Sequence, residues 1–119
     1  MSVADPEEQA PRPDQLLQLR AMLEAFLPGT RIETTTSLAA AAHIRRVQTG
    51  DVIFSQGEPV ELAMCLHGYA AFRRTTVEGQ QVMTAIASPG ELYGLTSIAG
   101  TISTVHMFAL NDGEVAVWH

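Results

Sequence analysis

The stretch that decides the fold is residues 50–90, "GDVIFSQGEPVELAMCLHGYAAFRRTTVEGQQVMTAIASPG". Its glycines recur first after 7 residues and then every 11 residues, at positions 50, 57, 68, 79 and 90. Strands of five or six residues joined by tight turns produce this spacing, because glycine adopts the backbone angles that tight turns require. The stretch therefore predicts a run of short strands.

Short apolar runs that end at turn residues also occur on both sides of this stretch. We interpret the following segments as strands with an adjoining turn: 43–50, 51–57, 62–68, 69–79, 80–90 and 113–119. Val77, Glu78 and Gly79 separate two of them and predict a β-hairpin. Many short strands at this spacing are typical of a sandwich, a jelly roll or a barrel, so a mainly β fold is predicted.

The chain divides into three parts by composition. Residues 1–12 carry charge and proline with nothing to bury, and we expect a disordered tail. Residues 13–42 are expected to form an N-terminal helical segment. Residues 43–119 are expected to form the β domain.

A helix is predicted over residues 14–27, where apolar side chains recur at helical spacing. Asp14 can cap its start, and Pro28-Gly29 ends it. A second, shorter helix is predicted with Ser37 as its cap. The apolar stripe of the first helix consists of Leu16, Leu19, Leu23 and Phe26, widened by Met22 and Leu27.

Net charge and cysteine content bear on which partners the chain can bind and on the compartment in which it works. The formal net charge is −6, from 7 basic and 13 acidic residues, which argues against this chain gripping nucleic acid by itself. Cys65 is the single cysteine, which suits a reducing compartment. The N-terminus lacks the pattern of a signal peptide, and no apolar run approaches the ~18 residues of a membrane span. A cytoplasmic protein without membrane contact is expected.

Five pieces of sequence, taken in order, carry a resemblance to a known family. They are Gly50-Asp51 before an apolar strand, "IFSQGE" at 53–58, Gly68 at a strand end, "VEGQQV" at 77–82 and "PGELYG" at 89–94. Residues 43–119 resemble the cyclic nucleotide-binding domain of bacterial Crp/Fnr transcription regulators. The resemblance implies a mainly β fold, an antiparallel double-stranded β-helix (jelly roll) with N-terminal helices.

The resemblance also implies an effector pocket. In members that bind a nucleotide, a turn and a short helix present backbone N–H groups to the cyclic phosphate. A glutamate after a glycine takes the ribose hydroxyl, and an arginine followed by a small hydroxyl residue holds the phosphate. The implied pocket residues in this chain are Gly94, Leu95, Thr96, Ser97, Ser103 and Thr104.

The two charged contacts of that pocket are missing. Leu95 occupies the glutamate position, and Ser103 occupies the arginine position. A charge-assisted hydrogen bond contributes about 1.5–3 kcal/mol. Losing both lowers affinity about a hundredfold or more, since ~1.4 kcal/mol is tenfold. We therefore expect a remodelled pocket that does not bind cyclic AMP in the usual way, with an unknown small-molecule effector.

Three residues are weak candidates for a metal or haem ligand. Cys65 and His67 lie two apart on a predicted strand and are expected to face the same way, and His106 follows the pocket. The alternative interpretation is structural, with a buried cysteine and two strand histidines, and we assign no metal site. One cysteine excludes an iron–sulfur cluster. In the pairs Arg45-Arg46 and Arg73-Arg74, alternation is expected to turn one residue of each pair outward, onto a solvated strand face.

The leading functional hypothesis is a non-enzymatic, effector-sensing domain of a Crp/Fnr-type regulator. The chain stops in what reads as the last strand, so we expect it to be truncated before a dimerisation helix and a helix-turn-helix. DNA binding and homodimerisation are then expected of the parent protein, through that missing part.

Two other function classes remain open. A cupin-like metalloenzyme needs converging histidines, usually with an H-x-H pair, and the histidines at 43, 67, 106 and 119 contain no such pair. The third interpretation is an interaction module whose pocket is vestigial.

Overall fold

The computed structural model describes residues 8–95 and 99–119. Its two helices are α1 (Pro13–Phe26) and α2 (Ile32–Ala41). Its strands are β1 (Glu8–Gln9), β2 (His43–Val47), β3 (Val52–Phe54), β4 (Leu62–His67), β5 (Ala70–Thr75), β6 (Gln81–Ala87), β7 (Leu92–Tyr93), β8 (His106–Ala109) and β9 (Gly113–Trp118).

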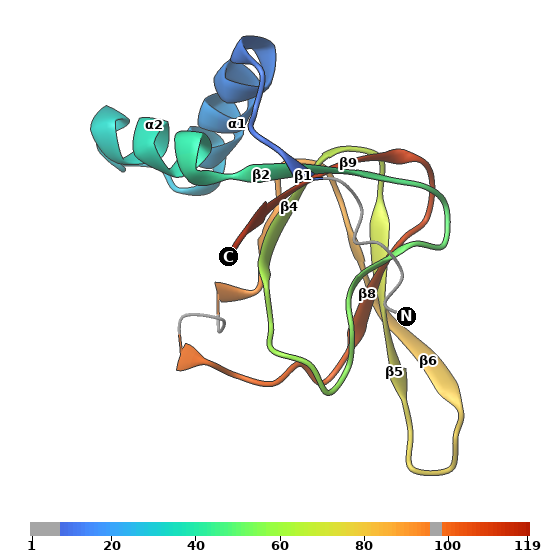
Figure 1. The fold of residues 1–119 in the computed structure, drawn as a ribbon. Coiled ribbons are helices and arrows are strands. Elements are labelled where there is room, and N and C mark those ends of the chain that lie inside the picture. The colour runs from blue at the N-terminus through green and yellow to red at the C-terminus, as the bar shows by residue number, and fades with distance from the viewer. Residues whose placement is uncertain (1–7, 96–98) are drawn as a thin grey trace.

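The strands form two sheets, and every strand pair in them is antiparallel. The five-stranded sheet has the order β1-β2-β9-β4-β7, and the four-stranded sheet has the order β3-β8-β5-β6. The two sheets curve around a common interior, and the β5–β6 hairpin projects away from it (Figure 1). The prediction of a mainly β fold with N-terminal helices is confirmed.

The space between the sheets holds the main apolar core. Cys65 and Val115 reach into it from the five-stranded sheet, and Phe72 and Met107 reach into it from the four-stranded sheet. All four are at least nine-tenths buried. The core is mostly aliphatic, with Phe72 stacked obliquely on Tyr93 at a ring distance of 4.9 Å.

The helices cover the outer face of the five-stranded sheet (Figure 1). Leu19 and Leu23 of α1 are completely buried against Ile44, Met64 and Leu66 of that sheet. These two leucines belong to the predicted apolar stripe, whereas Phe26 at its end is 38% exposed. The stripe is therefore confirmed at its centre and wrong at its C-terminal end.

Both predicted helix starts need correction. Helix α1 begins at Pro13, and the side-chain oxygen of Gln15 accepts the Arg12 N–H at 2.8 Å, so Asp14 is not the cap. Asp14 pairs instead with the Arg12 guanidinium at 3.2 Å. Helix α2 begins at Ile32, which places Ser37 inside the helix.

The predicted tail also differs in part. Residues 1–7 lie outside the described residues, but Glu8 and Gln9 form β1 and pair with Arg45 and Ile44 of β2. An ion pair between Glu8 and Arg45 joins β1 to β2. Among the described residues, neither helix is long and apolar enough to cross a membrane.

Candidate functional site

Gly94 opens the predicted pocket and lies directly against the backbone of Glu61. Its φ is +86°, and an added Cβ would overlap the Glu61 carbonyl oxygen. Only glycine combines this backbone angle with so close an approach. This contact therefore fixes the position of the backbone at the start of the segment that follows Gly94.

The other end of that segment is fixed on the same loop. The Gly57 N–H donates to the Ser103 carbonyl, and the Ser103 N–H donates to the Glu58 carbonyl, both at 2.8 Å. The Val60 N–H donates to the Thr101 carbonyl at 3.0 Å. Both limbs of residues 94–103 are thus held by the loop 57–61.

The residues at the two missing charge positions have different surroundings. Leu95 is 53% exposed, whereas Ser103 is only 5% exposed. The Ser103 hydroxyl donates to the Val105 carbonyl at 2.6 Å and accepts the Val105 N–H at 3.2 Å. Its hydrogen-bonding capacity is therefore used locally, in a turn that closes the loop.

Three hydroxyl residues complete the predicted pocket. Thr104 is described and is exposed. Thr96 and Ser97 lie outside the described residues. The structure therefore brings two of the predicted residues, Gly94 and Ser103, to one loop, residues 57–61.

Cys65 and His67 do not face the same way, so that prediction is wrong. The pairing of β4 with β9 shifts register between these two residues. Cys65 packs between the sheets, and burial together with the charge of Glu91 raises the pKa of its thiol to about 11. His67 is exposed and lies 3.8 Å from Glu114.

His106 is a strand histidine with one ring nitrogen already engaged. Its Nδ1 accepts the Gln56 N–H at 3.1 Å, and the residue pairs across the strands with Arg73. Over residues 8–95 and 99–119, no three His, Cys, Asp or Glu side chains come together in a way that could hold a metal ion.

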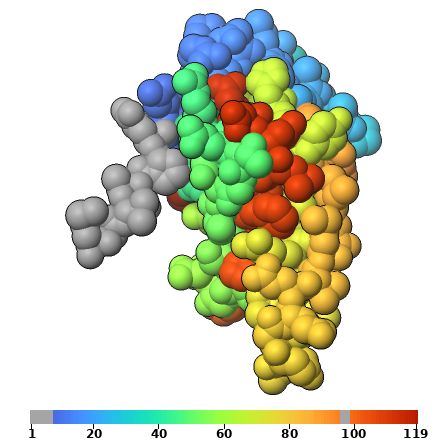
Figure 2. Space-filling model, turned by 90° about the vertical axis from the view of Figure 1, so that its right-hand side faces the viewer, coloured from blue at the N-terminus to red at the C-terminus, as the bar shows by residue number. Residues whose placement is uncertain are grey.

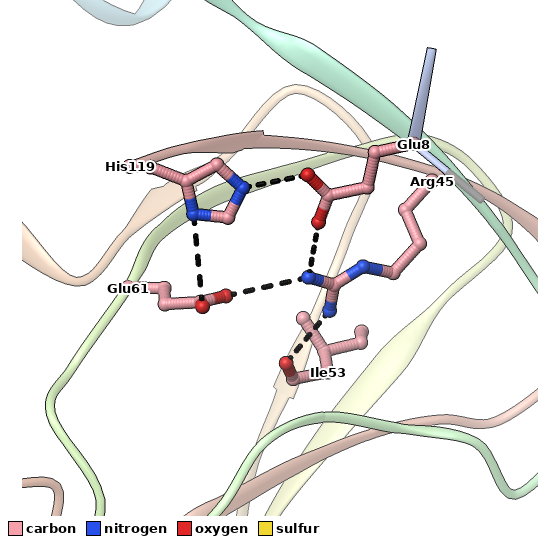
Figure 3. Close-up of polar contacts among 5 residues, drawn as sticks. All are labelled: Glu8, Arg45, Ile53, Glu61 and His119. Carbon is pink, nitrogen blue, oxygen red and sulfur yellow. Dashed lines mark hydrogen bonds and ion pairs between the residues drawn. The ribbon is translucent and has the colours of Figure 1, made fainter. Parts of the chain in front are cut away.

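The sequence analysis missed a charged cluster at the edge of the five-stranded sheet (Figure 3). The Arg45 guanidinium lies 2.6 Å from Glu8 and 3.7 Å from Glu61, and it donates to the Ile53 carbonyl at 2.9 Å. His119 closes the ring with its Nε2 2.6 Å from Glu8 and its Nδ1 3.9 Å from Glu61. We call Glu8, Arg45, Glu61 and His119 the edge cluster.

The edge cluster stabilises the charged form of Glu8. Burial by itself would raise the pKa of this carboxyl group, but hydrogen bonds from His119 and Arg45 outweigh it, and the pKa lies below its ordinary value. The cluster is electrically neutral when His119 is protonated, because two cations then face two carboxylates. It ties β1 to the body of the fold.

Glu61 links the edge cluster to the predicted pocket. Its carboxylate faces Arg45 and His119, while its carbonyl oxygen lies against Gly94. The Arg45 Nε and one Glu61 oxygen are buried without a hydrogen-bond partner among the described residues. Both residues line a cleft of about 360 Å³, which leaves space for water.

One residue of the pair Arg45-Arg46 faces outward, as alternation predicts, and the buried one is Arg45. It is 8% exposed, while the neighbouring Arg46 faces outward. The alternation of "HIRRV" at 43–47 contains this signal, since Arg45 has the same parity as the buried Val47. No local pattern identifies Glu8 as its partner, because the two residues are 37 positions apart.

Comparisons with known proteins agree with the fold described above. Residues 44–119 match the sequence model of a family described as the cyclic nucleotide-binding domain. No curated protein matches the chain significantly.

Solved structures of regulators are similar to this chain. The N-terminal domain of a transcriptional regulator from Streptomyces coelicolor A3(2) is 26% identical, with a TM-score of 0.69 over 84% of this chain and 71% of that chain. The catabolite activator protein of Thermus thermophilus is 26% identical, with a TM-score of 0.68 over 78% of this chain and 44% of that chain. The regulatory domain of Toxoplasma gondii PKA, crystallised with cAMP, has a TM-score of 0.79 at 16% identity over 89% of this chain and 42% of that chain. The chain spans less than half of the last two.

Proposed function

Because the chain belongs to the cyclic nucleotide-binding domain family, we propose that it is an effector-sensing domain of the Crp/Fnr type whose pocket does not hold cyclic AMP in the usual way. In this proposal it is a regulatory domain rather than an enzyme. Its effector carries less negative charge than a cyclic phosphate, or the pocket is vestigial.

The regulator assignment is supported by which solved structures resemble the chain in sequence. Those at 26% identity are a transcriptional regulator and a catabolite activator protein. The regulatory domain of Toxoplasma gondii PKA is similar in shape at 16% identity, which supports the fold alone. With a net charge of −6, the chain itself is not the DNA-binding part. DNA binding and homodimerisation belong, in this proposal, to the parent protein in the cytoplasm.

One observation carries the proposal of a remodelled pocket. The loop that supports residues 94–103 is in place, yet neither Leu95 nor Ser103 can offer a charge. Ser103 also turns its hydroxyl to the Val105 backbone. A cyclic nucleotide bound here would lack a carboxylate for its ribose hydroxyl and a guanidinium for its phosphate. Each missing contact lowers the binding free energy by about 1.5–3 kcal/mol.

Calorimetric titration with cyclic AMP and cyclic GMP tests the proposal. We expect no binding tighter than about 1 mM for the wild type. The double variant Leu95→Glu/Ser103→Arg should bind cyclic AMP at least about tenfold more tightly if the pocket shape is kept. Because Ser103 is buried, the thermal midpoint of the variant must be measured as well, so that loss of folding is not read as loss of binding.

One result would contradict the proposal, and another would decide between its two alternatives. Micromolar binding of cyclic AMP to the wild type would mean that another residue supplies the charge. A folded double variant that gains nothing would favour a vestigial pocket over a live sensor.

A further inference from the structure

The outer face of the four-stranded sheet carries an apolar row that crosses all four strands. Val52 of β3 pairs with Phe108 of β8, Phe108 pairs with Ala71 of β5, and Ala71 pairs with Ile86 of β6. Cross-strand partners point to the same side of a sheet. The neighbours of this row in sequence, such as Phe72, point into the core. Figure 2 views this side of the molecule, where β5 and β6 appear in yellow and gold and the blue helix lies above them.

This face breaks the usual pattern of an antiparallel sheet in water. One face of such a sheet is normally apolar and buried, and the other is polar. Here the exposed fractions are 42% for Val52, 49% for Tyr69, 56% for Met83 and 55% for Ile86. Exposed apolar patches on a monomer are often functional. Val52, Met83 and Ile86 give this face an apolar surface that is open to solvent.

Arg73 lies beside the apolar row and has no acidic partner. It pairs across the strands with Met83, and its guanidinium lies 4.7 Å from the centre of the Phe108 ring. Its Nε is buried and lacks a hydrogen-bond partner among the described residues. No described carboxylate forms an ion pair with it, in contrast to Arg12, Arg20, Arg31 and Arg45. Arginine and aromatic side chains in an apolar setting are typical of the centres of interfaces.

A second copy of the chain is a poor occupant for this face. A twofold axis that passes near Arg73 would bring two like-charged guanidinium groups together, which is repulsive. The occupant should therefore bring a negative charge of its own.

The five-stranded sheet indicates the shape of a suitable occupant. Its outer face is covered by α1, which places Leu19 and Leu23 on the sheet. Two polar contacts lie beside them, from Gln15 to Glu114 at 3.1 Å and from Gln18 to the Leu66 carbonyl at 3.3 Å. An amphipathic helix is the ordinary cover for one apolar sheet face.

We propose that the outer face of the four-stranded sheet docks an acidic amphipathic helix of a partner protein. The apolar side of that helix lies along the row from Val52 to Ile86, and one of its carboxylates pairs with Arg73. The proposal concerns a surface apart from the loop at 94–103.

Two synthetic helical peptides of about 18 residues, or five turns, provide the probes. They share the same leucine stripe, and one carries glutamate where the other carries lysine. Nuclear magnetic resonance titration of the whole chain should show shifts confined to β3, β5, β6 and β8 with the glutamate peptide. We expect that peptide to bind at least about tenfold more tightly than the lysine peptide. General electrostatics predicts the opposite order, because the chain has a net charge of −6.

Matched variants test the two parts of the surface. Ile86→Lys should weaken the glutamate peptide about tenfold, while Ile32→Lys should not, since Ile32 is 56% exposed on α2, far from this face in sequence. Arg73→Glu should reverse the preference between the peptides, while Arg74→Glu, one residue along β5, should leave the order unchanged. Circular dichroism confirms that each variant is folded.

Three results would overturn the proposal. Equal binding of both peptides would remove the role of Arg73. Shifts outside the four-stranded sheet would place the docking surface elsewhere. A concentration-dependent dimer in sedimentation velocity, abolished by Ile86→Lys, would assign the face to a second copy of the chain.

Discussion

The outer faces of the two sheets differ in what covers them. On the five-stranded sheet, Ile44, Met64 and Leu66 are at most 5% exposed beneath helix α1. On the four-stranded sheet, Val52 and Ile86 are 42% and 55% exposed, and no described helix covers them. Equally apolar side chains thus contribute to stability on one sheet and remain available for contacts on the other.

The largest expected effect comes from truncating an apolar side chain on each face. Leu23→Ala should cost about 4 kcal/mol, because Leu23 is 1% exposed between α1 and the sheet and a cavity would remain. Ile86→Ala should cost less than about 0.5 kcal/mol, as a surface change. Urea unfolding of the two variants measures both values. A cost above about 2 kcal/mol for Ile86→Ala would show that the four-stranded sheet is already covered in the isolated chain.

The two sheets also differ in how they hold an arginine. Arg45→Ala should destabilise the fold by about 3 kcal/mol, because Glu8 and Glu61 would lose their buried cation. Arg73→Ala should cost less than about 1 kcal/mol, since only a cation–π contact with Phe108 is lost. Thermal unfolding of both variants checks the difference. Equal costs would mean that Arg73 has a partner in solution and would weaken the proposed docking surface.

The sequence predicts the strands and not the surfaces around them. The glycine spacing at 50–90 predicts β3, β4, β5 and β6 and their turns, because tight turns impose a local requirement on the backbone. The edge cluster depends on a contact between Glu8 and Arg45, 37 residues apart, which no local pattern contains. The opposite orientations of Cys65 and His67 arise from a register shift against β9, which is also a property of pairing rather than of sequence order.

In the candidate site, too, local backbone requirements were predictable from the sequence and long-range contacts were not. The positive φ at Gly94 is a local requirement, whereas its close approach to the Glu61 backbone is a contact between residues far apart in the sequence. The burial of Ser103 depends on hydrogen bonds to the loop 57–61, about 45 residues earlier in the chain. Its hydroxyl contact with Val105 could not be deduced from an alignment of motifs.

A pH titration sharpens the comparison at the edge of the five-stranded sheet. The lowered pKa of Glu8 means that its contacts stabilise the fold above the ordinary carboxyl value of 4.5 and that this stability is lost as pH falls through the folded value. The difference in stability between the wild type and Glu8→Gln should therefore be fully present above about pH 6 and should disappear below about pH 3. Glu33→Gln is the matched control, because Glu33 is exposed and pairs loosely with Arg31 at 3.9 Å, so it should show no such trend. A stability difference between the two proteins that persists in acid would mean that Glu8 acts through packing and not through charge.

The smallest expected effect is the slow labelling of Cys65, which reports on the space between the two sheets. Burial and the charge of Glu91 raise the pKa of this thiol to about 11, so at pH 8 the thiolate is about a hundredfold scarcer than at the ordinary value of 9.0. The side chain is also 2% exposed, so reagent reaches it only when the sheets separate. Labelling by a disulfide reagent should therefore proceed at the rate of global opening, with Cys65→Ala as the blank. Leu23→Ala should accelerate it, since losing the helix contact weakens the five-stranded sheet, whereas Ile86→Ala should leave the rate unchanged. Fast, complete labelling of the native wild type would show that the sheets open without unfolding, and the contrast between a covered and an uncovered sheet would then concern their motions as well as their surfaces.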